Sequence, residues 1–148
     1  MTSFALAKKN MISTKGLTIS QLLRSTDTLR KSGSGDTIIK ALSFTRTGNG
    51  MLVAKAKMLS AKGPPVVYDT WITFMELKDR SRITPTAKVM AQCSCADYMY
   101  RWEYANAAHN AARIFYGNGE PPDEQNPAQK PGLCKHAYCL AKKLIETY

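Results

Sequence analysis

Four side chains of metal-ligand type stand in two close pairs, and their spacing constrains the fold more than any other feature. One residue separates Cys93 from Cys95, one residue separates Cys134 from His136, and 38 residues lie between the pairs. Residues two apart in an extended segment point to the same side, and a chain entering a helix is still turning, so each pair can face one ion. Zinc prefers four such sulfur and nitrogen ligands in a tetrahedron. We therefore predict one structural Zn²⁺ site, formed by Cys93, Cys95, Cys134 and His136.

Two further residues offer alternative ligands. Cys139 follows His136 by three residues, so it falls on the same helix face and could replace a ligand, although a small buried core thiol is the simpler interpretation. His109 lies in an Ala-rich helical stretch with Tyr and Asn neighbours, which favours a packed or hydrogen-bonded histidine over a ligand.

The cysteines are expected to be reduced. The opening residues 1–17 have two lysines in the middle, Lys8 and Lys9, and no apolar core of a secretion signal, and no apolar run approaches the roughly 18 residues of a membrane span. We expect a protein that is made and kept in a reducing cytoplasm, not secreted and without a membrane partner. Cysteines in that compartment serve as metal ligands or core residues more often than as disulfides.

Hydrophobic periodicity predicts an α+β fold. Leu52, Ala54, Ala56 and Met58 alternate with lysines as in a half-buried strand, and apolar residues after Cys134 recur at helical spacing. We expect a small antiparallel sheet with C-terminal helices, joined by the zinc site. The predicted strands are 37–45, 51–59, 66–77 and 87–93, and the predicted helices are 97–115, with Asp97 as its N-cap, and 134–148.

The predicted organisation is an N-terminal arm followed by one domain. Residues 1–35 form the arm, with a short helix that ends near Leu29 and a turn or flexible link at 32–35, where Ser and Gly alternate. Residues 36–148 form a single α+β domain, with the zinc site in 89–148.

The charge balance indicates an acidic partner. The chain carries 21 Lys and Arg against 11 Asp and Glu, a formal net charge of +10, which attracts nucleic acid or an acidic protein surface. The basic residues are scattered, however, with no run typical of a nucleic-acid-binding arm. Aromatic and basic residues in 98–104 could stack bases, but Tyr98 and Trp102 are four residues apart, so packing on one helix face is the simpler interpretation.

Two resemblances follow from these motifs. C-x-C, a long insert and C-x-H over about 89–144 resemble the SWIM-type zinc finger, which implies nucleic-acid binding or protein interaction. The strings Cys93-Ser-Cys-Ala-Asp-Tyr-Met-Tyr-Arg-Trp102, Asn126-Pro127 and Pro131-Gly-Leu-Cys-Lys-His136 are also similar to small zinc-binding virion proteins of large tailed bacteriophages. This second resemblance implies a particle protein that is made in the host cytoplasm and located in the virion.

The expected function is therefore non-enzymatic. A zinc deaminase signature, a nucleophile elbow, a phosphate-binding loop and a zincin motif are all absent from the sequence. We expect a zinc-stabilised structural or interaction protein of a tail or baseplate, with other structural proteins as partners and no small-molecule substrate. The alternative is a SWIM-type nucleic-acid-binding module; under the leading hypothesis nucleic-acid binding is weak and non-specific.

Overall fold

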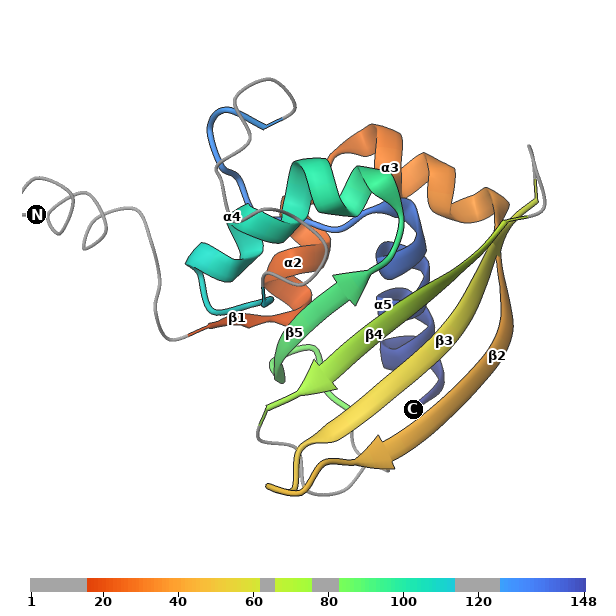
Figure 1. The fold of residues 1–148 in the computed structure, drawn as a ribbon, viewed down its shortest axis with the longest axis vertical. Coiled ribbons are helices and arrows are strands. Elements are labelled where there is room, and N and C mark those ends of the chain that lie inside the picture. The colour runs from red at the N-terminus through yellow and green to blue at the C-terminus, as the bar shows by residue number, and fades with distance from the viewer. Residues whose placement is uncertain (1–15, 62–65, 76–82, 114–125) are drawn as a thin grey trace, which may run out of the picture.

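The computed structural model describes residues 16–61, 66–75, 83–113 and 126–148, which form a sheet with helices packed against it (Figure 1). The sheet has five antiparallel strands in the order β1-β5-β4-β3-β2, and the last four form a meander. Both the α+β class and the antiparallel sheet were predicted and are confirmed. The strands are β1 Leu17–Thr18, β2 Thr37–Arg46, β3 Leu52–Ser60, β4 Val67–Phe74 and β5 Lys88–Cys93.

The core lies between the sheet and helix α5 (Lys135–Thr147), which runs behind the strands in Figure 1. On β3 the predicted alternation is confirmed, because Leu52, Ala54, Ala56 and Met58 are at most 3% exposed. The helix contributes the matching apolar stripe, and the residues of that stripe are fully buried. These helix residues are Ala137, Leu140, Ala141 and Leu144.

The first part of the predicted arm that the structure describes, residues 16–26, contributes to the core. Helix α2 (Ile19–Ser25) begins with a capping box between Thr18 and Gln21, and Ile19 and Leu22 are fully buried. The prediction of a single helix as far as Leu29 is wrong, because the helix ends at Ser25 and Thr26 is its C-cap. The Thr26 hydroxyl donates to the Leu22 carbonyl at 2.7 Å and accepts from the Leu133 amide at 3.0 Å.

A second short helix replaces the predicted link. Asp27 caps α3 (Thr28–Gly33), and the chain continues directly as the 3₁₀ turn η1 (Ser34–Asp36). The Ser and Gly residues at 32–35 are therefore helical, which corrects the expectation of a turn or flexible link. Residues 1–15 of the predicted arm lie outside the described part of the chain.

The helix predicted at 97–115 is shorter than expected. It consists of a π-helical turn, η3 (Tyr98–Trp102), and α4 (Glu103–Ala108). Asn110 then adopts a left-handed conformation with φ 58°, and the Ala111 carbonyl accepts from the Ala91 amide at 2.8 Å. The helix ends because the chain turns back there to bond with β5. None of the described helices is long and apolar enough to cross a bilayer.

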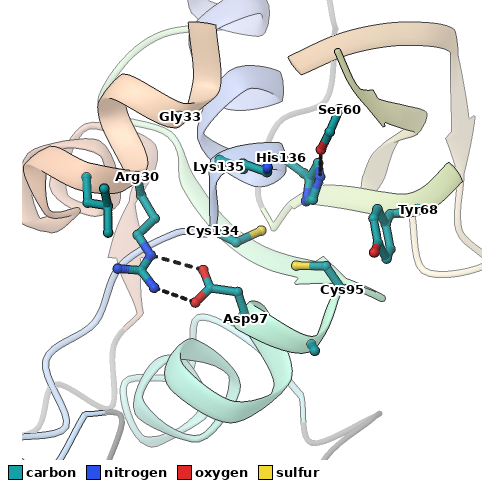
Figure 2. A pocket seen from close by; sticks show the side chains of 11 residues that line it. Arg30, Gly33, Ser60, Tyr68, Cys95, Asp97, Cys134, Lys135 and His136 are labelled. Atoms are coloured by element: carbon teal, nitrogen blue, oxygen red, sulfur yellow. Dashed lines mark hydrogen bonds and ion pairs between the residues drawn. The ribbon is translucent and has the colours of Figure 1, made fainter. Parts of the chain in front are cut away.

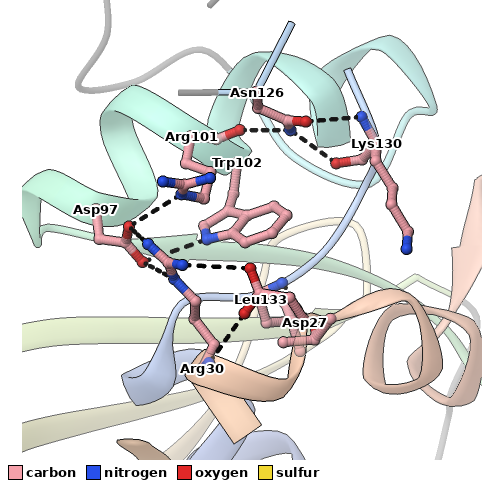
Figure 3. Close-up of polar contacts among 9 residues, drawn as sticks. Asp27, Arg30, Asp97, Arg101, Trp102, Asn126, Lys130 and Leu133 are labelled. Atoms are coloured by element: carbon pink, nitrogen blue, oxygen red, sulfur yellow. Dashed lines mark hydrogen bonds and ion pairs between the residues drawn. The ribbon is translucent and has the colours of Figure 1, made fainter. Parts of the chain in front are cut away.

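The described part of the proline-rich segment, 126–134, is irregular, and two asparagines hold it in place. The Asn126 side chain bonds the carbonyls of Arg101 and Lys130, each at 2.8 Å (Figure 3). Buried Asn106 donates to the Gly132 carbonyl at 2.8 Å and accepts from the Gly132 amide at 3.0 Å. These amide side chains satisfy backbone groups that no helix or strand partner reaches.

Gly132 tests this close packing. A Cβ atom there would lie 2.6 Å from the Trp102 ring, a distance that requires the buried indole or the backbone to move. We expect Gly132→Ala to lower the free energy of unfolding by about 1–3 kcal/mol, as overpacking does elsewhere. Gly35→Ala is the matched control, because a Cβ at Gly35 meets no atom within 4 Å. Urea denaturation that shows equal stability for the two variants would contradict this packing.

Candidate metal centre

The structure brings the four predicted ligands to one place. Cys93 is the last residue of β5, Cys95 follows two residues later, and Cys134 and His136 lie at the start of α5. Their ligand atoms all lie within 4.8 Å of one another, and each residue is at most 4% exposed. Donor atoms around a tetrahedral zinc ion are separated by roughly 3.8 Å, so small side-chain movements bring these four to coordination distance.

Two of the sulfurs stand at helix starts. The Cys95 Sγ accepts from the Tyr98 amide, and the Cys134 Sγ accepts from the Ala137 amide, each at 3.4 Å. Each sulfur therefore has the role that a Ser or Asp oxygen has in an ordinary N-cap. A thiolate is favoured at this position, because the free amide groups at a helix start carry partial positive charge.

The third sulfur is bonded from the neighbouring strand. Thr70 on β4 lies directly opposite Cys93 in the sheet, and its Oγ1 is 3.3 Å from the Cys93 Sγ. Thr70 is fully buried, so this contact also satisfies its hydroxyl. When Cys93 is a thiolate, the hydroxyl donates to it. Each of the three sulfurs thus has a donor from the protein that disperses negative charge.

The position of His136 indicates which ring nitrogen faces the ion. Its Nδ1 is 3.9 Å from the Cys93 Sγ, whereas its Nε2 is 3.3 Å from the Ser60 Oγ at the end of β3 (Figure 2). The Tyr68 ring packs beside the imidazole, with 4.8 Å between ring centroids. Ser60 and Tyr68 therefore orient the ring so that Nδ1 faces Cys93 and would be the ligand atom of a bound ion, while Nε2 is held by the contact with Ser60.

The thiol pKa values also favour a cation. Burial, followed by hydrogen bonds with Cys93 and Cys95, raises the pKa of Cys134 well above its usual value. Burial raises the pKa of Cys93 as well, but hydrogen bonds from Cys134 and Cys95 outweigh it and leave that pKa well below its usual value. The sulfurs compete for negative charge, and a bound cation allows all three to ionise together.

A cavity of about 490 Å³ lies beside the cluster, and Cys95, Cys134 and His136 line it (Figure 2). Since metal ions must reach a buried site, this cavity supplies an entry path. Arg30 and Asp97 form its opposite wall.

Asp97, two residues after Cys95, joins the Cys95 loop to Arg30 in this wall of the cavity. Its carboxylate accepts from Arg30 Nη2 at 2.6 Å and from Arg30 Nε at 3.1 Å, and also from Arg101 and the Trp102 indole (Figure 3). Burial raises the pKa of Asp97, but the hydrogen bonds and charge of Arg30 outweigh it and lower that pKa below its ordinary 3.8. Asp97 holds the N-cap position of η3, as predicted, but its side chain makes no capping hydrogen bond, because these partners engage the carboxylate.

The two alternative ligands lie elsewhere. The Cys139 thiol is half-buried and donates toward the Thr37 carbonyl at 3.8 Å, outside the four-residue cluster. His109 lies at the end of α4, where burial lowers its pKa. The sequence did not predict three residues near the cluster: Ser60, Thr70 and Arg30. Each is brought there by strand register or tertiary packing, which no local motif indicates.

Comparisons with known proteins place no further constraint on this site, since no protein-family model, no curated protein and no solved structure matches the chain. The donor chemistry is therefore the basis for interpretation. Three buried sulfurs and one imidazole nitrogen form a set that can hold one metal ion with four protein ligands.

The role of Ser60 is testable. We expect Ser60→Ala to weaken metal binding by roughly 10- to 100-fold, the usual effect of removing a hydrogen bond behind a ligand, as measured by competition with a chelator. The control is Ser43→Ala, because Ser43 is exposed on the sheet and remote from the cluster. Imidazole ¹⁵N spectra of the metal-bound protein should show coordination through Nδ1. Coordination through Nε2, or equal affinities for the two variants, would refute this arrangement.

The hydrogen bonds that Asp97 accepts can be tested separately. Asp97→Asn removes a charged acceptor from several hydrogen bonds, so we expect the free energy of unfolding to fall by about 1–3 kcal/mol at pH 7. Since the native pKa of Asp97 is lowered, the carboxylate contributes fully above its ordinary pKa of 3.8 and loses its effect as the pH falls through the native value. The exposed Lys142–Glu146 pair supplies the control, Glu146→Gln. Urea unfolding should show a clear loss for Asp97→Asn alone.

Proposed function

We propose that this protein binds one structural Zn²⁺ through Cys93, Cys95, Cys134 and His136, and that it acts as a non-enzymatic, zinc-stabilised component of a multi-protein assembly. The observation that carries the proposal is the buried cluster of three thiols and one imidazole where β5 meets α5. The resemblance of the surrounding motifs extends the proposal to the virion of a tailed bacteriophage, in its tail or baseplate.

Zinc fits the donor set best among common metals. Thiolates select zinc, copper(I) and iron–sulfur chemistry, while calcium and magnesium require oxygen ligands. A mixed set of three sulfurs and one imidazole nitrogen in tetrahedral arrangement is one of the usual structural zinc sites. Iron–sulfur clusters are held by cysteines or by two cysteines and two histidines, and this set matches neither.

A structural role fits better than catalysis. Catalytic zinc keeps one position for water or substrate, whereas four protein ligands complete the tetrahedron here. The amide and hydroxyl donors to each sulfur further reduce the reactivity of the thiolates. The zinc therefore supplies stability: it joins the last strand of the meander to the helix that covers it, so its binding free energy becomes folding free energy.

The assembly role rests on two supports. If the metal site only stabilises the fold, the function depends on the exposed surfaces. The net charge of +10 favours binding of these surfaces to an acidic partner. The similarity of the strings at 93–102 and 131–136 to tailed-phage virion proteins supports a phage particle as the kind of assembly. If the proposal holds, peptides of this chain will be found at fixed stoichiometry in particles purified from the phage that encodes it. Their absence from such particles would overturn the virion assignment but not the zinc site.

Metal removal tests the zinc site directly. We expect native mass spectrometry to detect one zinc ion per chain, and a chelator to remove it together with the compact charge states. Cys134→Ser should lose the ion, while the matched variant Cys139→Ser should retain it and cost only about 1 kcal/mol of stability. A compact wild-type protein without metal would refute the proposal. Loss of metal in Cys139→Ser with retention in Cys134→Ser would overturn the ligand assignment.

A further inference from the structure

The sheet has a second face, turned away from α5, that the described helices leave open over β2, β3 and β4 (Figure 1). Strand register sets a row of side chains across this face: Ser43, Lys55, Trp71 and Gln92 lie opposite one another on four consecutive strands. Partners in antiparallel strands point to the same side, so these side chains are neighbours. All four are half-buried or exposed.

We propose that this face, centred on Trp71, binds single-stranded nucleic acid. The proposal uses none of the four metal-centre side chains and goes beyond the structural role of zinc. Of the aromatic residues at 98–104, Tyr98 and Trp102 are buried in the core and cannot stack on bases, so the proposed contact does not use them.

The surroundings of Trp71 match the needs of a base. Next to the indole is a cavity of about 150 Å³ that Thr73, Met90, Gln92 and Arg113 also line. The indole and the thioether offer apolar surface for stacking, and the Thr73 hydroxyl and the Arg113 guanidinium offer hydrogen bonds to base edges. A duplex keeps its bases stacked inside, so only an unpaired base can reach a side chain in the middle of a sheet.

Two cations lie near the indole. Lys55, one strand away, holds its Nζ over the Trp71 ring at 5.5 Å from the centroid, and the exposed Arg113 lines the same small cavity as Trp71. Among the residues that the structure describes, Asp69 is paired with Lys57 at 2.6 Å. Glu103 is 1% exposed and bonded to Gln92. The face therefore presents positive charge to a phosphate backbone.

The outer residues of β2 leave space for a strand to lie flat. Ala41, Ser43 and Thr45 are small and exposed, and they stand opposite Lys57, Lys55 and Val53. The lysines of β3 are therefore accessible from the β2 side. An acidic protein surface would use the same lysines but would gain nothing from an aromatic ring set between hydrogen-bonding groups, which is why a polynucleotide is the better fit.

The experiment measures fluorescence anisotropy of a labelled mixed-sequence single-stranded oligonucleotide with the zinc-loaded full chain. Trp71→Ala should weaken binding by about ten-fold or more, the usual effect of losing one stacked base, and Trp71→Phe should retain most of the affinity. The control is Tyr100→Ala, which removes an aromatic residue that is 62% exposed outside the sheet. Zinc content and circular dichroism confirm that each variant is folded, so a failed site is distinguishable from a failed fold.

The salt dependence supplies a second readout. Lys55→Gln should reduce the slope of log K against log salt by about 0.7, the value for one phosphate of a single strand. Lys142→Gln on α5, behind the sheet, should leave the slope unchanged. Three results would overturn the proposal: equal affinities of Trp71→Ala and Tyr100→Ala, equal binding of duplex and single strand, or competition by polyglutamate as strong as by unlabelled oligonucleotide.

Discussion

Burial of three cysteines and one histidine at a single point is the constraint on which the rest of this structure depends. The cluster gathers the end of β5, the start of the 98–108 helical segment and the start of α5. Two of its sulfurs cap helices and the third bonds to β4, so the ligands also determine where these elements begin. Metal coordination and secondary structure are thus parts of the same arrangement, and removal of the ion affects both.

Two side-chain amides and one carboxylate fix the segments near the cluster that have no regular secondary structure. Asn106 and Asn126 bond the backbone around 130–132, which leads directly to Cys134. Asp97 fixes the other pair of cluster residues, because it joins the loop after Cys95 to Arg30 on α3. Both halves of the metal centre are therefore held from behind by buried or half-buried polar groups, which explains how an irregular chain delivers its ligands accurately.

The sequence allowed prediction of the features that rest on local periodicity or on spacing. The alternation on β3, the stripe on α5 and the four ligands are of this kind, and the structure places all of them as expected. The break at Thr26 could not be predicted, because its cause is a hydrogen bond to Leu133, 107 residues away. The early end of α4 has a similar cause, since Ala111 bonds to β5. The helix propensity of the local sequence favoured longer helices in both places, but tertiary hydrogen bonds ended them earlier.

Strand alternation connects the two faces of the sheet. On β4 and β5, Thr70 and Cys93 point inward to the metal centre, while the next pair, Trp71 and Gln92, points outward. Because neighbouring residues on a strand share one backbone, a metal that fixes the end of β5 also fixes the register of the outward pair. A metal centre with buried ligands would thereby act on the outer face of the sheet. A chain of this size would then need no second folding core to order that face, since one buried ion would set the position of both faces.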